Sequence, residues 1–590
     1  MYVRTTARRN ADGTEVRYLH LAHNEWDPAA GRSVPKVLHS FGREDQLDRP
    51  AVKRLVASLS KLLDPADALT ATAGSELTFL ESRPYGGAYA LDGLWRRLGL
   101  DTIVGKLLQG PRGRPRDPAA ERVLFALVAN RALAPSSKLA AADWVTHDVH
   151  IPGLPECTDD ACYRAMDWLR QVKDTLEKEV FWQAATLFDL EVDLLFFDTT
   201  STYFELDEAD PPVARDPHGQ VLPSTGSPTS NSGDGDGDGD GDGDGKVAGF
   251  RTYGKSKDHR PDLPQVVIGM AVTRTGIPVR VWCWPGNTGD SALIRQVKAD
   301  MRDWTLARII WVADRGFASE VNRRYLRHGD HHYIIGEKLR SGSAEATAAL
   351  SRQGRYQQVA DNLRVKEVRI SEHERFVICH NPDGADRDAA VRARLLDQLG
   401  ELIDGSDKLS KTKRAELRGV ISTKPGLNRY LRLTPGGLLR IDAKKVKTET
   451  NLDGKYLLRS SDPHLSAEDI AVGYKQLLEV ERGWRDMKQV IDLRPVYHRL
   501  EERIRAHVVL CWLALLLIRI AETTTAQTWP DIRRELQRLH VGTFTGPAGL
   551  FRQRTELTKP HRDILAKLGL TPPKPIIDLA TPPQPDQYVP

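Results

Sequence analysis

Two short, nearly continuous apolar runs, each ending in an aspartate, constrain the fold most strongly. They read DLLFFD at residues 193–198 and RIIWVAD at residues 308–314. Runs of this kind are typical of strands buried on both faces in α/β proteins. Such sheets usually place their chemistry at the carboxyl ends of the strands. Asp198 and Asp314 are therefore candidate functional residues, and an aspartate that caps the following turn is the simpler alternative for each.

The segments around these runs predict the rest of one sheet. Residues 265–274 and 278–284 have the pattern of two strands joined by a hairpin at residues 275–277. Asp290 is expected to cap the helix that follows the hairpin. A second helix and a short strand follow the run at 308–314. The order β-β-β-α-β-α-β predicts an α/β fold with a mixed sheet and helices on both faces.

Changes in residue pattern divide the chain into six regions. Short alternating strands near the N-terminus give way to helical spacing, then to strands, and then to helices again. We expect a β segment at 1–50 and a helical DNA-binding domain at 51–190. A catalytic core is expected in two parts, at 191–340 and 463–525; the first part contains an acidic Gly-Asp linker at about 206–248, and a β-rich insertion at 341–462 separates the two parts. A C-terminal helical segment with a Pro-rich tail is expected at 526–590.

The helical region contains a possible DNA-binding hairpin. Residues 120–133 have helical spacing, and Ser136 or Ser137 can cap the helix that begins with KLAAADWV. Two helices joined by a tight turn suit DNA binding, and simple helix packing explains the same pattern. The basic loop GPRGRPRD at residues 110–117 favours the DNA-binding interpretation over simple packing.

Composition narrows the classes of protein. Five cysteines without a CxxC spacing exclude a disulfide scaffold and argue against a structural zinc site. The apolar run at 508–518 is too short to span a bilayer and predicts a buried helix, and the N-terminus shows no secretory signal. The net charge of +4 becomes +10 without the six aspartates of Gly233–Gly245. We therefore expect a cytoplasmic protein that binds nucleic acid and no membrane.

A third candidate carboxylate, Glu481, lies on a predicted amphipathic helix. At 100° per residue, the helix has two stripes turned by roughly a quarter to a third of a circle. The apolar stripe consists of Val480, Trp484, Met487 and Ile491. The polar stripe consists of Tyr474, Glu481, Arg485 and Lys488. Glu481 can therefore lean toward the sheet, and a solvated surface charge is the simpler alternative.

Three such carboxylates are enough for metal-dependent phosphoryl transfer. Magnesium prefers hard oxygen ligands, and two ions about 4 Å apart can activate a nucleophile and stabilise the leaving oxygen. Lys488 follows Glu481 by two turns on the same face, so it can contact a DNA phosphate.

These residues resemble the DDE transposases of bacterial insertion sequences, whose catalytic core is RNase H-like. The helix is similar to the Tyr-x2-Arg-x3-Glu-x6-Lys signature of the insertion-sequence-four superfamily, with Tyr474, Glu481 and Lys488 in place and Leu477 instead of the arginine. Arg482 or Arg485 can compensate for that change. The stretches YGKSKDHRPDLPQVVIGMAV, VADRGF and VERGWRDMKQVIDLRPVYH carry the resemblance further, over about residues 80–520.

The resemblance implies an enzyme that binds terminal inverted repeats, cuts them and joins them to target DNA. It implies Mg2+, with Mn2+ as a substitute, a homodimer or larger assembly on paired double-stranded DNA ends, and a place in the cytoplasm at the nucleoid. The implied catalytic and metal-binding residues are Asp198, Asp314 and Glu481. The implied DNA contacts are Tyr474, Arg485, Lys488, Arg315, Lys255, Lys257 and His259.

Two other interpretations share the same residues. One is a repurposed or inactive DNA-binding protein of the same descent, and the other is a metal-dependent nuclease without strand transfer. The presence of all three carboxylates and Lys488 favours an active transposase.

Overall fold

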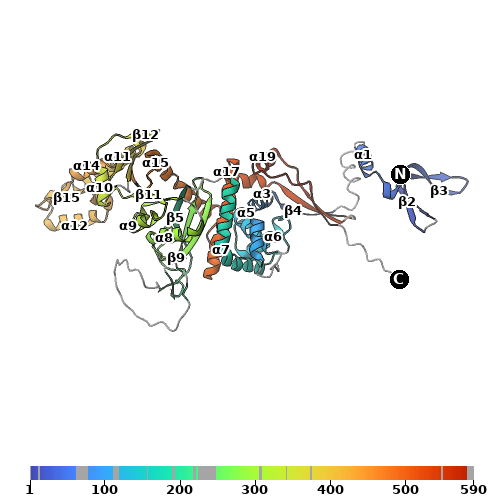
Figure 1. The fold of residues 1–590 in the computed structure, drawn as a ribbon, viewed down its shortest axis with the longest axis horizontal. Coiled ribbons are helices and arrows are strands. Elements are labelled where there is room, and N and C mark those ends of the chain that lie inside the picture. Colours follow the sequence, from blue (N-terminus) through green and yellow to red (C-terminus); the bar gives the residue numbers. More distant parts are fainter. Residues whose placement is uncertain are drawn as a thin grey trace. The chain divides into compact units, whose positions relative to one another are not determined.

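The computed structural model describes most of the chain, and its contacts divide it into two units. The described residues are 2–10, 13–60, 78–109, 119–155, 157–188, 193–216, 219, 221–222, 247–304, 308–340, 342–371, 375–546 and 549–580. Unit 1 comprises residues 1–82, 542–553 and 576–590, and unit 2 comprises residues 83–541 and 554–575. Each unit is described by itself (Figure 1).

Unit 1 is built mainly from two small sheets. The first contains β1 (Tyr2–Arg9), β2 (Glu15–Asp27) and β3 (Arg32–Arg43), all antiparallel, which confirms the expected N-terminal strands. A short turn of helix (Glu44–Gln46) and α1 (Arg49–Ser60) follow. The second sheet has the order β20-β19-β18-β4, with bounds Ile576–Ala580, Gly549–Arg554, His540–Gly546 and Thr78–Pro84. The C-terminal region therefore contains strands as well as the helices that the sequence predicted.

Unit 2 begins with a group of helices. They are α3 (Gly86–Arg97), α4 (Leu100–Leu108), α5 (Ala120–Leu133), α6 (Lys138–His147) and α7 (Asp159–Phe188). Ser137 caps α6 as expected, since its side chain accepts a hydrogen bond from the Ala140 amide at 3.2 Å. Every residue of α5 from Arg122 to Leu133 is buried, which is what simple helix packing predicts. The basic loop at 110–117 lies outside the described residues.

The core helix of unit 2 is α17 (Glu501–Thr525). It contacts α5, α7 and strand β9, and α18 (Trp529–Leu536) and α19 (Lys559–Lys567) pack beside it. Among the described residues it is the one helix long and apolar enough to cross a membrane, and its whole apolar window is buried inside the protein. This is the burial of a core helix, as the sequence predicted.

A nine-stranded mixed sheet forms the centre of unit 2, which confirms the expected mixed α/β class. Its order is β12-β13-β14-β17-β11-β10-β5-β8-β9. The central strands β11, β10 and β5 are parallel, and the outer pairings are antiparallel. The strand bounds are β5 Leu194–Tyr203, β8 Gln265–Val272, β9 Pro278–Pro285, β10 Ile310–Ala313, β11 His332–Glu337, β12 Gln357–Ala360, β13 Leu363–Arg369, β14 Arg375–His380 and β17 Lys455–Ser460.

Helices cover both faces of this sheet. On one face α8 (Asp290–Asp300) and α9 (Glu320–Leu326) bury a large apolar core that includes Phe197 and Trp311. On the other face lie α15 (Ala467–Lys475) and α16 (Leu478–Gln489). Each of these two helices approaches the sheet closely at a glycine. A Cβ atom at Gly473 of α15 would lie 3.0 Å from a Leu194 methyl, and one at Gly483 of α16 would lie 2.7 Å from the Met270 methyl.

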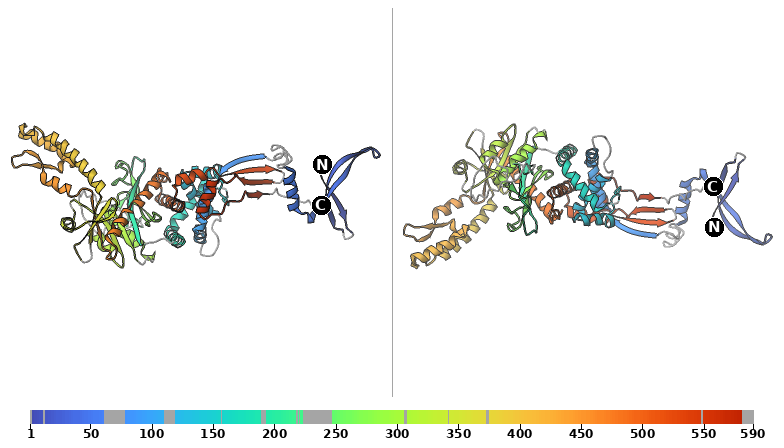
Figure 2. Two further views of the ribbon diagram at one scale, coloured as in Figure 1. Left: turned by 90° about the horizontal axis from the view of Figure 1, so that it is seen from above. Right: turned by 90° about the horizontal axis from the view of Figure 1, so that it is seen from below.

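The structure differs from the β-rich insertion predicted at 341–462. Its strands β12, β13, β14 and β17 join the nine-stranded sheet rather than forming a module of their own. Helices supply much of the remainder: α10 (Ala344–Ser351), α11 (Pro382–Ile403), α12 (Lys411–Ser422), α13 (Pro425–Asn428) and α14 (Ala443–Thr450). With the hairpin β15 (Leu431–Leu433) and β16 (Leu439–Ile441), α11 to α14 enclose a small core and project from the sheet (Figure 2).

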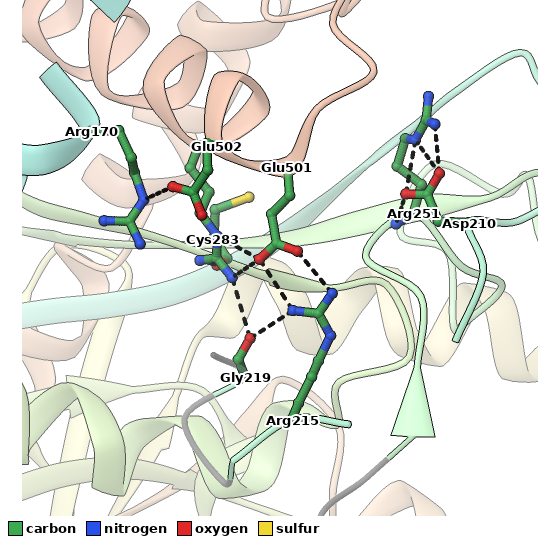
Figure 3. A network of polar contacts seen from close by, with 9 residues as sticks. Arg170, Asp210, Arg215, Gly219, Arg251, Cys283, Glu501 and Glu502 are labelled. Atoms are coloured by element: carbon green, nitrogen blue, oxygen red, sulfur yellow. Dashed lines mark hydrogen bonds and ion pairs between the residues drawn. The ribbon is translucent and has the colours of Figure 1, made fainter. Parts of the chain in front are cut away.

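Described residues on either side of the acidic run Gly233–Gly245 are held together, and residues 223–246 lie outside the described residues. Strand β6 (Val213–Ala214) pairs with β7 (Val247–Ala248). Arg215 donates to Glu501 of α17 at 2.8 Å, and Arg251 pairs with Asp210 at 2.5 Å (Figure 3). Residues 213–214 and 247–248, on either side of the acidic run, are therefore neighbours in the fold.

Deleting Gly233–Gly245 is expected to shift the melting temperature by no more than about 1–2 °C. The deleted run has no apolar side chain, its flanks are closed by the β6–β7 pair, and the entropy of closing a loop depends weakly on loop length. Thermal unfolding of the deletion variant and the intact chain measures this. A fall of more than about 5 °C, on the order of 1 kcal/mol or more, would show that the run is structural.

Candidate active site

Asp198 lies within a strand rather than at the end of one. The sequence placed the strand end at Asp198, but β5 continues to Tyr203 because Thr199–Tyr203 keep pairing with β8. The parallel neighbour β10 stops at Ala313, opposite Phe197. Asp198 is therefore the first residue of β5 beyond the end of β10. Alternation along β5 puts its side chain on the face covered by α15 and α16.

Asp314 is the residue that follows β10, and the register brings it beside Asp198. Because Ala313 pairs with Phe197, the next residues in each parallel strand are the two aspartates. Adjacent strands lie about 4.8 Å apart, so the two carboxylates are neighbours. The pKa of Asp198 is raised to about 6, mainly by burial and to a smaller extent by the charges of Asp314 and Asp290, against the opposing effects of Lys257 and the Thr199 amide. The structure thus brings two of the three predicted carboxylates together.

Tyr474 of α15 contacts Asp314. Its hydroxyl donates a hydrogen bond to Asp314 Oδ1 at 3.2 Å, and its ring stacks on Tyr456. A Cβ at Gly336 of β11 would overlap the Tyr474 hydroxyl, so glycine at this position makes room for it. Burial raises the pKa of Tyr474, and the Asp314 charge raises it further, so the hydroxyl stays protonated and can donate.

Glu481, the third predicted carboxylate, lies on a second helix, α16. The single helix predicted through Val490 is wrong: α15 ends at Lys475 and α16 begins at Leu478, so Tyr474 and Glu481 do not share one helical phase. Glu481 lies exposed in the first turn of α16, and its charge contributes to the raised pKa of Tyr474. Among the described residues no three His, Cys, Asp or Glu side chains form a ready-made metal cluster.

Two residues at the site were not predicted in their present roles. Asp290 was expected to cap α8, but it accepts a hydrogen bond from Thr199 Oγ1 at 2.9 Å instead. Lys257 was expected to contact DNA, but its ammonium donates to the Thr199 carbonyl at 2.6 Å. The same Nζ lies 3.3 Å from Asp290 Oδ2 and 3.9 Å from Asp198 Oδ1. The carboxyl group at a helix start was the available signal for Asp290, and capping explained it equally well.

Lys488 is close to the site and is paired with an acidic residue. Its Nζ lies 2.8 Å from Asp258 Oδ1, and Arg494 lies 3.3 Å from the other oxygen of Asp258. Arg494 also stacks over Tyr203, the last residue of β5, at 4.6 Å. The remaining predicted DNA contacts, Arg485, Arg315, Lys255 and His259, are exposed.

The carboxylates fit a hard divalent cation. Asp198 and Asp314 can present oxygen ligands from adjacent strands, and Asp290 lies beyond Lys257, 3.3 Å from its Nζ. The Lys257 ammonium lies 3.9 Å from Asp198 Oδ1 and 3.3 Å from Asp290 Oδ2, so these two carboxylates already face a positive charge. Oxygen ligands of this kind suit Mg2+ and Mn2+.

Two family models match separate parts of this chain. The family described as "Transposase DDE domain" matches residues 235–517, and the "IS1634 family transposase, N-terminal domain" matches residues 3–69. A solved piggyBac transposase synaptic complex with hairpin DNA is 11% identical, with a TM-score of 0.34 over 76% of this chain and 79% of that one. No curated protein matches. The two family matches together cover more than half of the sequence, and the chain therefore belongs to the DDE transposases of bacterial insertion sequences.

Proposed function

We propose that this transposase binds the ends of its own insertion sequence, cuts them and joins the freed ends to target DNA. Asp198, Asp314 and Glu481 are the proposed catalytic carboxylates and metal ligands. The observation that supports the proposal is the register of β5 and β10, which sets Asp198 beside Asp314, together with the hydrogen bond from Tyr474 to Asp314.

The sheet supports an RNase H-like core. Strands β5, β8 and β9 form an antiparallel meander, and β10 and β11 then add in parallel on the other side of β5. Helix α8 precedes β10, and α9 precedes β11. This β-β-β-α-β-α-β order places Asp198 on the first strand and Asp314 after the fourth.

The residues of the chain have distinct proposed roles. Asp198, Asp314 and Glu481 would hold the ions, and Tyr474 keeps one oxygen of Asp314 oriented through its hydrogen bond. Bound Mg2+, or Mn2+ in its place, supplies an activated water or 3′-hydroxyl and stabilises the leaving oxygen. Lys488, Arg485 and Arg315 are the proposed phosphate contacts, because all three are basic and come from segments that carry Tyr474, Glu481 or Asp314.

The proposed substrate is double-stranded DNA that carries the terminal inverted repeats, with a dimer or larger assembly on paired ends. A plasmid that carries the sequences flanking the gene tests this proposal. We expect Mg2+-dependent nicking at the repeat boundaries, abolished by EDTA and restored by Mn2+. Nicks spread evenly over the plasmid would instead indicate an unspecific nuclease.

Lys488→Ala is expected to weaken binding to the element end without unfolding the protein. The side chain is 17% exposed and is paired with Asp258, so it lies outside the apolar stripe of α16. Loss of one phosphate contact should reduce the slope of log K against log salt by about 0.9. Lys424→Ala, which removes an exposed lysine at the start of α13, is the matched control. An unchanged slope for Lys488→Ala would remove it from the DNA interface.

A further inference from the structure

Two consecutive residues, Lys257 and Asp258, occupy the two oppositely charged parts of the site. Lys257 Nζ lies 3.3 Å from Asp290 Oδ2 and 3.9 Å from Asp198 Oδ1, and it donates to the Thr199 carbonyl at 2.6 Å. It therefore supplies the positive charge that the carboxylates need in the absence of a metal ion.

Asp258 offsets the positive charges of Lys488 and Arg494. One of its oxygens lies 2.8 Å from Lys488 Nζ, and the other lies 3.3 Å from Arg494. Its side chain is only 13% exposed, so this pairing is largely shielded from water. A carboxylate held between a lysine and an arginine has the charge and the hydrogen-bonding pattern of a bound phosphate.

The backbone of residues 256–258 is hydrogen-bonded to β5, so the side chains can change their rotamers while the backbone stays in place. The Lys257 amide donates to Ser201 Oγ at 2.9 Å. Ser256 Oγ accepts hydrogen bonds from the amides of Asp258 at 3.2 Å and Arg260 at 3.1 Å. Rotation of the Lys257 and Asp258 side chains about their own bonds is then enough to vacate both positions.

We propose that Lys257 and Asp258 are internal surrogates for the metal ion and the DNA phosphate, which leave their positions when the two ligands bind. The inference rests on the proposed function, because it takes Asp198 as a metal ligand and Lys488 as a phosphate contact. In the free protein, Lys257 and Asp258 each offset part of the opposite charge around them, and each ligand exchanges with a group whose charge has the same sign. The exchange makes metal and DNA compete with the Lys257–Asp258 pair.

The first arm of the test measures Mn2+ binding to the full chain without DNA. Lys257→Met keeps the length of the side chain and removes the ammonium, so we expect about three- to tenfold tighter Mn2+ binding, read from the electron-spin-resonance signal of free Mn2+. Lys424→Met removes a surface ammonium elsewhere and should not change the affinity. Equal or weaker Mn2+ binding by Lys257→Met would overturn the inference.

Thermal unfolding distinguishes the proposed role of Lys257 from a purely structural one. Without divalent ions, Lys257→Met should melt below the wild type, because Asp198 and Asp290 lose their counter-charge. Added Mn2+ should close that gap, since an ion that binds the folded state stabilises it. A deficit that Mn2+ leaves unchanged would show a structural lysine and overturn the inference.

The second arm measures binding of a short random-sequence duplex. Asp258→Asn keeps the shape of the side chain and releases Lys488 and Arg494, so we expect about three- to tenfold tighter binding. Asp383→Asn on α11 removes an exposed carboxylate from an element outside the site and serves as the control. Weaker duplex binding by Asp258→Asn would show that Asp258 positions the two cations for DNA, contrary to the inference.

The outcomes separate this inference from the proposed function. If Asp198→Asn leaves Mn2+ affinity at the wild-type value, the proposed metal site itself is wrong. If Asp198→Asn weakens Mn2+ binding and Lys257→Met does not tighten it, the metal site stands and the inference about Lys257 fails.

Discussion

Asp198→Asn is expected to lower the rate of DNA cleavage by at least about a thousandfold while leaving end binding intact or slightly stronger. Asparagine keeps the shape of the side chain and removes a charge that a metal ion needs, and such an ion contributes several kcal/mol of transition-state stabilisation. Loss of the negative charge also lessens repulsion of the DNA backbone. Single-turnover nicking of an end-containing duplex with Mg2+ measures the rate, and a mobility-shift assay measures the binding.

The folded state is expected to tolerate this substitution. The pKa of Asp198 is raised to about 6, above the value of about 3.9 for an unfolded chain, so the folded state disfavours the ionised carboxylate. That carboxyl contributes stability at low pH, which is lost as the pH rises between these two values. At pH 7 without divalent ions, Asp198→Asn should therefore melt no lower than the wild type.

Asp193→Asn provides a matched control on the same segment. Asp193 precedes β5 and pairs with Arg274 at 2.5 Å, away from the Asp198–Asp314 neighbourhood. Its substitution should leave the cleavage rate unchanged. Near-normal nicking by Asp198→Asn with Mg2+ would show that Asp198 is not a metal ligand.

Trp484→Ala is expected to lower the free energy of unfolding by roughly 3–5 kcal/mol. The Trp484 side chain is buried, with 6% exposed, in the stripe of α16 that includes Val480 and Met487. Its indole nitrogen has no hydrogen-bond partner among the described residues, so packing accounts for its contribution. Urea unfolding measures the loss. Trp182→Ala on α7, where the side chain is 37% exposed, should have a much smaller effect.

A different result is expected if Trp484 contacts DNA and not the core. An aromatic ring near a catalytic site can stack on a DNA base. In that case Trp484→Ala would melt like the wild type and lose DNA affinity. This result would contradict the assignment of the core face of α16, and with it the side of the helix on which Glu481 lies.

The sequence predicted the strands of the core well because their residues are nearly all apolar. Both apolar runs form parallel neighbours, β5 and β10, and the hairpin at 275–277 joins β8 to β9. The end of β5 was missed because Thr199–Thr202 are β-branched or small and keep pairing with β8. The strands within 341–462 could not be assigned to the main sheet, since pairing between distant segments leaves no local pattern.

The candidate site was predictable only in part. The two aspartates followed from their places at the ends of apolar runs, and their adjacency needed the register. Periodicity alone extended one helix across Gln476 and Leu477, because both residues are common inside helices. The positions of Lys257 and Asp290 depend on contacts between segments 33 residues apart in sequence, which periodicity does not encode.

A strand-transfer reaction in vitro distinguishes a transposase from a nuclease and from an inactive DNA-binding protein. A labelled element end, identified from the inverted repeats that flank the gene, is incubated with the wild-type protein, Mg2+ and a target plasmid. We expect covalent joining of the label to the plasmid, abolished separately by Asp198→Asn, Asp314→Asn and Glu481→Gln. Cleavage without joining would indicate a nuclease, and joining that survives these substitutions would contradict the assigned site.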